Sequence, residues 1–180
     1  MELLSSFFAP PAAVPGVGPR KVVSAADLAA HRDAFDRDGH RIVFTNGCFD
    51  LLHVGHVRYL QAARALGDAL AVGLNADASV RALKGPGRPL NSADDRAEIL
   101  AALACVDFVT IFSEPRATHL LAEVRPHIYV KGGDYRLETL NPEEYAVLQA
   151  IGARIEFVGL VPGRSTTGTI ERMQVGNAPT

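Results

Sequence analysis

The chain has 180 residues, of which 48% are hydrophobic and 21% are charged, a length and balance typical of one soluble globular domain. Its formal net charge of -2 argues against a nucleic-acid-binding protein, which needs a basic excess, although local cations can still bind a small anion. Because Cys48 and Cys105 show no disulfide pattern and no apolar run approaches the roughly 20 residues that span a bilayer, we expect a cytoplasmic protein without a membrane partner.

The first half of the chain alternates between helical and extended patterns. Residues 1–20, rich in Pro, Gly and Ala, are predicted to be a flexible leader. A helix is predicted to begin after Ser24, a capping residue with Asp27 three positions on, and to end at Gly39. Hydrophobic periodicity then predicts a buried strand over 41–46, a helix over 55–67 and a second buried strand over 69–75.

The second half continues this alternation. It contains a short helix over 78–84, a Gly- and Pro-rich loop over 84–91, a helix over 92–104, and strands over 107–112, 127–132 and 154–159 with helical segments between them. A terminal helix is predicted over 165–173, before a flexible tail at 175–180. Residues 21–174 are therefore expected to form one α/β domain, a Rossmann-like doubly wound parallel sheet with helices on both faces. Ligands bind such sheets beyond the carboxyl ends of the strands.

The segment "NGCFDLLHVGH" follows the first predicted strand. His53 and His56 are three positions apart and face one side of a helical turn, while Gly47 and Gly55 permit close approach of the backbone. A helix start offers unpaired N–H groups and a positive dipole end, which suit a phosphate. Two alternatives stay open: ordinary packing of the two rings, and a zinc site with Cys48 as third ligand, although the spacing matches no zinc template.

Four segments together resemble one protein family. "GCFDLLHVGH" is similar to the HxGH signature of the cytidylyltransferase-like nucleotidyltransferases, and the family order continues with "LKGPGRPLNSADDR" (83–96), "VKGGDY" (130–135) and "GRSTTGTI" (163–170). The match spans residues 41 to about 173, and the "NGCFD", "RPLN" and "KGGDY" versions most closely resemble the adenylyltransferases that make ADP-heptose from heptose 1-phosphate. That activity is often fused to a sugar kinase, for which this chain has no room, so the resemblance is to the stand-alone form.

The resemblance implies which residues contact the nucleotide. His53, His56 and Lys84 are expected to be catalytic, because the corresponding family positions contact the triphosphate. Structural roles stay open for other residues of these motifs. Asp50 can form a hydrogen bond within its own turn, segment 130–135 can be a simple turn, and segment 163–170 can be a helix cap. The residues expected to bind the nucleotide are Asn46, Gly47, Cys48, Phe49, Asp50, Gly55, Lys131, Gly132, Gly133, Asp134, Arg164, Ser165, Thr166 and Thr167.

Two arginines in the second segment are expected to bind the sugar phosphate. Arg88 lies in the Gly- and Pro-rich loop, and Arg96 lies in the first turn of the helix that follows. The positive end of the helix dipole makes that turn a poor place for a cation. A bound anion explains the position of Arg96, and an ion pair with Asp94 or Asp95 is the simpler alternative.

The implied reaction transfers AMP from Mg-ATP to heptose 1-phosphate and releases pyrophosphate. The attacking phosphate oxygen needs no general base, because its second pKa of about 6 leaves it largely ionised at neutral pH. Mg²⁺ is expected only as the ion that accompanies ATP, without a protein metal site, and a homodimer is compatible with the family. Open alternatives are a cytidylyltransferase for a phosphorylated alcohol such as glycerol phosphate, a heptose-phosphate enzyme that uses GTP, and a nucleotide-binding regulatory module.

Overall fold

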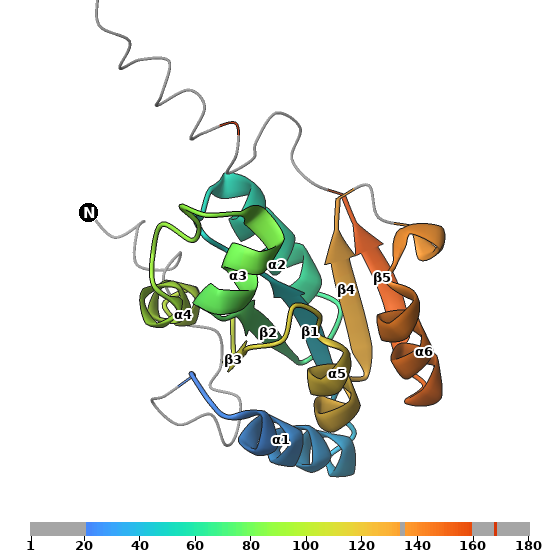
Figure 1. The fold of residues 1–180 in the computed structure, drawn as a ribbon. Coiled ribbons are helices and arrows are strands. Elements are labelled where there is room, and N and C mark those ends of the chain that lie inside the picture. Colours follow the sequence, from blue (N-terminus) through green and yellow to red (C-terminus); the bar gives the residue numbers. More distant parts are fainter. Residues whose placement is uncertain (1–20, 134–135, 160–167, 169–180) are drawn as a thin grey trace, which may run out of the picture.

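The computed structural model of the protein describes residues 21–133, 136–159 and 168. Within them, one sheet is formed by β1 (Ile42–Gly47), β2 (Ala69–Asn75), β3 (Phe108–Phe112), β4 (Ile128–Gly132) and β5 (Arg154–Val158). The helices around it are α1 (Ala25–Arg37), α2 (Val54–Arg64), α3 (Asp77–Lys84), α4 (Ala93–Ala101), α5 (Thr118–Val124), the short 3-10 helix η2 (Leu137–Thr139) and α6 (Pro142–Ala150). Figure 1 shows the strands at the centre of the molecule with helices around them.

All strands of this sheet are parallel, in the order β3-β2-β1-β4-β5. The chain starts at the central β1, moves outward through β2 and β3, and then crosses to β4 and β5 on the other side. The strand order therefore reverses between β1 and β4, which is where doubly wound sheets form their ligand crevice. The predicted Rossmann-like fold class is confirmed.

Helices cover both faces of the sheet (Figure 1). On one face, α1, α5 and α6 pack through apolar side chains that include Leu28, Leu121 and Leu148. On the other face, α2 and α4 pack through side chains that include Leu60 and Leu100. Because both faces are covered, the central strands read as continuous apolar runs in the sequence instead of alternating patterns.

The sequence signals account for the starts of several elements. Ser24 caps α1 by accepting the N–H of Asp27 at 3.1 Å, and Asn141 caps α6, whose first residue is Pro142. Each strand that was predicted within the described residues is present. The predicted leader, tail and terminal helix lie outside those residues, except for Gly168. No helix in the described part of the chain is long and apolar enough to cross a membrane.

Candidate active site

A cavity of about 690 Å³ opens at the carboxyl ends of three strands. β1 contributes Asn46 and Gly47, β2 contributes Asn75, and β4 contributes Lys131 and Gly132. The rest of the lining comes from the β1–α2 turn, the first half of α2, the end of α3, the segment between β3 and α5, and the stretch from the end of η2 to the start of α6. The volume falls within the range of roughly 300–1,000 Å³ that is common for small-molecule sites. The cavity lies at the switch in strand order, so it is the candidate active site.

His53 and His56 begin helix α2 and hold each other in position. His53 is the N-cap, and its Nδ1 accepts the N–H of Gly55 at 3.1 Å. In return, the Nδ1 of His56 accepts the N–H of His53 at 3.4 Å. The two rings stack with their centroids 3.9 Å apart. Because each Nδ1 acts as an acceptor, each neutral ring carries its proton on Nε2 and donates from that atom.

His56 lines the cavity as a neutral donor. Burial, together with the neighbouring His53 and Lys84, lowers the pKa of His56 from 6.5 to about 4. The cation of this part of the site is Lys84, which lines the same cavity from the last turn of α3. A directed Nε2–H and a lysine beside the positive end of the α2 dipole form an arrangement that suits a phosphate.

The β1–α2 turn packs tightly against itself. Phe49 has a φ of 42°, a left-handed conformation that residues other than glycine rarely adopt. Its ring occupies the space beside Gly47, where an added Cβ would come within 3.1 Å of the ring. A larger residue at position 47 would therefore crowd the Phe49 ring. Burial raises the pKa of the Cys48 thiol, so this side chain is a neutral part of the cavity wall.

Asp50 anchors the loop that follows α3. Its side chain accepts the N–H of Leu90 at 2.7 Å and the Nε–H of Arg88, and its backbone carbonyl accepts from the side chain of Asn91 at 3.2 Å. Burial alone would raise the pKa of Asp50, but the hydrogen bonds from Leu90 and Arg88 outweigh burial and lower it. The carboxylate therefore clamps the β1–α2 turn to residues 88–91.

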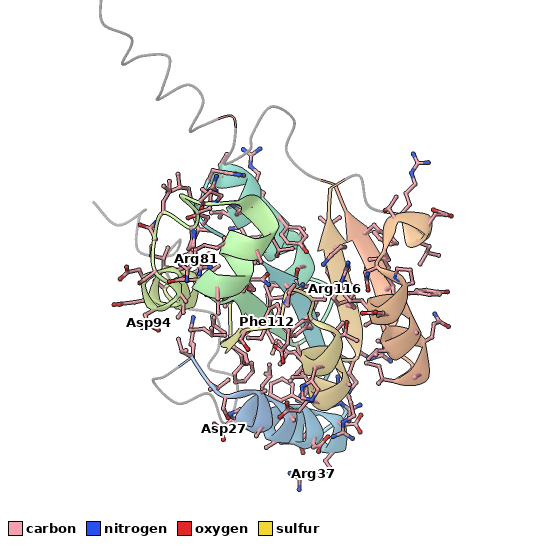
Figure 2. The ribbon with its side chains drawn as sticks, viewed as in Figure 1. Asp27, Arg37, Arg81, Asp94, Phe112 and Arg116 are labelled. Atoms are coloured by element: carbon pink, nitrogen blue, oxygen red, sulfur yellow. The ribbon has the colours of Figure 1, made fainter. Side chains whose placement is uncertain are left out.

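Arg96 is buried behind the cavity. The residue is 1% exposed, and its guanidinium donates to the carbonyls of Cys48, Asn75 and Asn91, at 2.6, 2.9 and 3.1 Å, and to the carboxylate of Asp77, at 2.7 Å. Asp94 instead projects from the outer surface of α4 (Figure 2), and Asp95 accepts from Ser92. The geometry thus gives Arg96 a structural role, and its contact with the sugar phosphate stays a prediction. Its ion pair is with Asp77 and with neither predicted aspartate.

The end of β4 packs against the ring of Tyr59 in α2. A Cβ on Gly132 would come within 2.8 Å of this ring. The ring is fixed, because its hydroxyl donates to the carbonyl of Val130 at 3.0 Å and shares a hydrogen bond of 2.6 Å with Thr45. Gly132 is therefore required by packing within the protein, and Gly133 has a φ of 102°, a conformation that favours glycine. Close approach of a nucleotide to these glycines stays a prediction.

The predicted site residues fall into three groups. Those that line the cavity are Asn46, Gly47, Cys48, Phe49, Asp50, His56, Lys84, Lys131 and Gly132. Those that are described but lie outside its lining are His53, Gly55, Arg88, Arg96 and Gly133. Those outside the described residues are Asp134, Arg164, Ser165, Thr166 and Thr167. The fold therefore brings three of the four motif segments to one cavity.

Among the polar residues that line the cavity, Asn75, Arg116, Thr139, Asn141 and Glu144 were missed in the sequence. Asn75 ends β2, and a polar residue at the carboxyl end of a buried parallel strand is a signal that could have identified it. Arg116 precedes α5 (Figure 2), and Glu144 lies in the first turn of α6. A loop arginine and an acidic first turn are common in any protein, so neither carries a functional signal.

The described residues contain no group of three or more His, Cys, Asp and Glu side chains that could hold a metal ion. The zinc alternative required Cys48, His53 and His56 to form such a group. Their arrangement instead engages both imidazole Nδ1 atoms in capping α2. The His pair is therefore organised around the helix terminus.

A histidine donor at a helix N-terminus, at the switch point of a doubly wound sheet, is typical of nucleotide-binding α/β proteins. The family model described as "Cytidylyltransferase-like" matches residues 44–163. The chain belongs to this family and is a nucleotidyltransferase.

Curated relatives and solved structures agree with this assignment. The chain is 57% identical to "Bifunctional protein HldE" of Syntrophotalea carbinolica over 137 residues, which are 76% of this chain and 28% of that protein. It is 51% identical to the protein of the same name from Geobacter sulfurreducens over 158 residues, 88% of this chain and 32% of that protein. The chain thus spans about a third of the length of these relatives. The solved lipopolysaccharide core biosynthesis protein from Thermoplasma volcanium GSS1 has 27% identity and a TM-score of 0.55, covering 68% of this chain and 98% of that one.

Proposed function

We propose that the protein transfers AMP from Mg-ATP to heptose 1-phosphate, forming ADP-heptose and pyrophosphate. The observation that carries the proposal is the neutral His56 donor, which faces the cavity beside Lys84 at the start of α2. The choice of ATP and heptose is supported by the "NGCFD", "RPLN" and "KGGDY" segments, which resemble those of ADP-heptose-forming adenylyltransferases. A structural relative named for lipopolysaccharide core biosynthesis is consistent with a sugar acceptor.

The proposed reaction needs charge compensation more than acid–base chemistry. An oxygen of the sugar phosphate forms a bond to the α-phosphorus of ATP while the bond from that phosphorus to the bridging oxygen of pyrophosphate breaks. The nucleophile is already ionised, since a phosphate monoester has a second pKa of about 6. Negative charge grows on the leaving pyrophosphate, and donors fixed in advance at that position lower the barrier.

In this proposal, side chains of the cavity and of the loop beside it compensate the negative charge of the phosphates. The Nε2–H of His56 donates to the triphosphate, with His53 stacked behind it as the cap of α2. Lys84 adds a positive charge from α3. We assign the phosphate of the acceptor to Arg88, whose Nη2 is buried without a partner among the described residues. Contacts from Asp134, Arg164 and residues 165–167 to the nucleotide are part of the same proposal.

Magnesium enters as part of the Mg-ATP substrate. In Mg-ATP the ion is coordinated mainly by phosphate oxygens and water. Its role is to neutralise charge on the triphosphate.

A matrix of substrates tests the proposal. The protein is incubated with ATP, CTP or GTP, each with heptose 1-phosphate or glycerol 3-phosphate, and pyrophosphate release is measured. We expect the highest kcat/KM for ATP with heptose 1-phosphate, and a strong loss in the His56→Ala variant. Turnover confined to CTP with glycerol 3-phosphate, preference for GTP, or nucleotide binding without turnover would each overturn the proposed substrates.

A further inference from the structure

A buried carboxylate lines the same cavity as His56. Glu144, in the first turn of α6, is 5% exposed. Its Oε1 accepts the N–H of Ala117 at 3.0 Å, which fixes the side chain to the start of α5. Its Oε2 lies 3.5 Å from the hydroxyl of Tyr129 and 3.9 Å from the Nζ of Lys131. Both separations are long for a hydrogen bond, so Oε2 keeps the capacity to accept a stronger one.

Asn46 extends this wall at the end of β1. Its Oδ1 accepts the hydroxyl of Tyr129 at 2.8 Å and the Nζ of Lys131 at 2.9 Å. Both donors are on the oxygen of Asn46, so its amide nitrogen is left to donate elsewhere, and the residue lines the cavity. The wall therefore offers a carboxylate acceptor and amide donors, and contacts within the protein hold both in place.

The carboxylate of Glu144 suits hydroxyl groups and does not suit phosphate. An ionised phosphate oxygen only accepts hydrogen bonds, so it cannot satisfy the carboxylate of Glu144, and the two negative charges repel. A sugar hydroxyl can donate to Glu144 and accept from Asn46 at the same time. The cavity is thus divided between phosphate donors at His56 and Lys84 and a hydroxyl-binding wall at Glu144 and Asn46.

We propose that Glu144 and Asn46 bind the hydroxyl groups of the acceptor sugar, and that Glu144 determines specificity for a polyhydroxylated sugar phosphate. The inference rests on the proposed function and adds to it the position of the sugar. It moves Asn46 from the nucleotide side of the cavity, where the family resemblance placed it, to the acceptor side. Glu144 is a binding residue in this scheme and takes no part in proton transfer.

The test compares Glu144→Gln with Glu143→Gln, the exposed neighbour on α6. Glutamine keeps an oxygen for the N–H of Ala117, so the melting temperature should change little, whereas the charged acceptor is lost. We expect Glu144→Gln to raise the KM for heptose 1-phosphate about 10–100-fold, the range for hydrogen bonds to charged groups. The KM for ATP and the values of Glu143→Gln should stay close to those of the wild type.

Monodeoxy analogues of heptose 1-phosphate give a second readout that a merely structural role would not change. In the wild type, removal of one particular hydroxyl should lower kcat/KM about 10-fold or more, and Glu144→Gln should lose this discrimination. The inference is overturned if Glu144→Gln raises the KM for ATP instead, or if no monodeoxy analogue differs from the parent in the wild type. Absence of wild-type turnover with heptose 1-phosphate would instead refute the proposed function.

Discussion

At the scale of single residues, the proposed mechanism places a neutral imidazole where charge develops. The low pKa of His56, about 4, means that the ring is uncharged at neutral pH and acts through a directed Nε2–H. The hydrogen bonds to both Nδ1 atoms fix the tautomer and the orientation of the rings before any substrate binds. A donor that needs no reorientation during the reaction is the more effective kind. The formal positive charge comes from Lys84, which can follow the phosphate on a flexible side chain.

Replacing His56 with alanine removes this donor and little else. We expect kcat to fall about 10²–10³-fold, the usual effect of losing one preorganised donor. The melting temperature should change only slightly, because the backbone contact that is lost with the ring is a long one of 3.4 Å. Pyrophosphate release and thermal denaturation measure the two effects. His119→Ala, on the exposed surface of α5, is the control. An unchanged rate in His56→Ala would remove the residue from the mechanism.

The same residue predicts a pH dependence of stability. The unfolded chain titrates this histidine near 6.5 and the folded chain near 4, so the unfolded state binds more protons between these values. The stability that the neutral ring contributes is fully present above pH 6.5 and is lost as the pH falls through 4. NMR titration of the ring should give a midpoint of about 4, and His56→Gln should lose less unfolding free energy over this window. A midpoint near 6.5 would contradict the burial of the ring.

At the scale of elements, buried polar side chains attach loops to the strand ends. Arg96 of α4 ties together the carbonyls at the ends of β1 and β2 and the segment before its own helix. Asp50 ties the β1–α2 turn to the loop after α3. Since Cys48, Asp50 and Lys84 line the cavity from these segments, both tethers determine the shape of this part of the cavity.

Removal of Arg96 should therefore act mainly on stability. We expect Arg96→Ala to lower the free energy of unfolding by about 3–5 kcal/mol, because it leaves buried carbonyls and Asp77 without their charged donor. Urea denaturation measures this change, and Glu98→Ala, exposed on the same helix, is the matched control. A fully stable Arg96→Ala variant with only a raised KM for sugar phosphate would favour the direct contact that the sequence predicts.

The contact between β4 and α2 gives another prediction. Gly132→Ala would place a methyl group within 2.8 Å of the Tyr59 ring, which hydrogen bonds hold in place. We expect a loss of about 1–3 kcal/mol in unfolding free energy, as is usual for overpacking. Gly159→Ala, where a Cβ meets nothing within 4 Å, should be close to neutral. Equal denaturation midpoints for the two variants would show that the β4–α2 contact is looser than described.

At the scale of the whole molecule, the sheet order makes the site. Because β1 is the central strand, the turn that carries His53 and His56 lies beside the end of β4. These two neighbouring parts of the cavity wall are separated in the chain by more than half of the described sequence. The strands were predictable, because buried parallel strands are continuous apolar runs in the sequence, and here glycine or asparagine often marks the end of a run. The position of the β1–α2 turn at the cavity was predictable too, because its histidines and glycines form a local motif.

The remaining part of the site depends on contacts that the sequence does not encode locally. In the sequence, Arg96 is only a cation in a first helical turn. Its burial results from contacts with the ends of β1 and β2 and with the loop before α4, which only the tertiary structure brings together. Glu144 reads as an ordinary first-turn carboxylate, and it reaches the cavity because α6 packs beside α5. Residues of this kind need the tertiary structure for their identification.

NMR of the His56 ring in the presence of nucleotide tests most directly whether this donor binds a polyphosphate. With ¹⁵N-labelled histidine at neutral pH, the free protein should show a neutral ring with its proton on Nε2. Addition of Mg-ATP to saturation should shift the Nε2 signal as the new hydrogen bond forms, whereas adenosine should leave the signal in place. An Nε2 chemical shift that does not change with Mg-ATP, or that changes equally with adenosine, would contradict phosphate binding by the histidine pair.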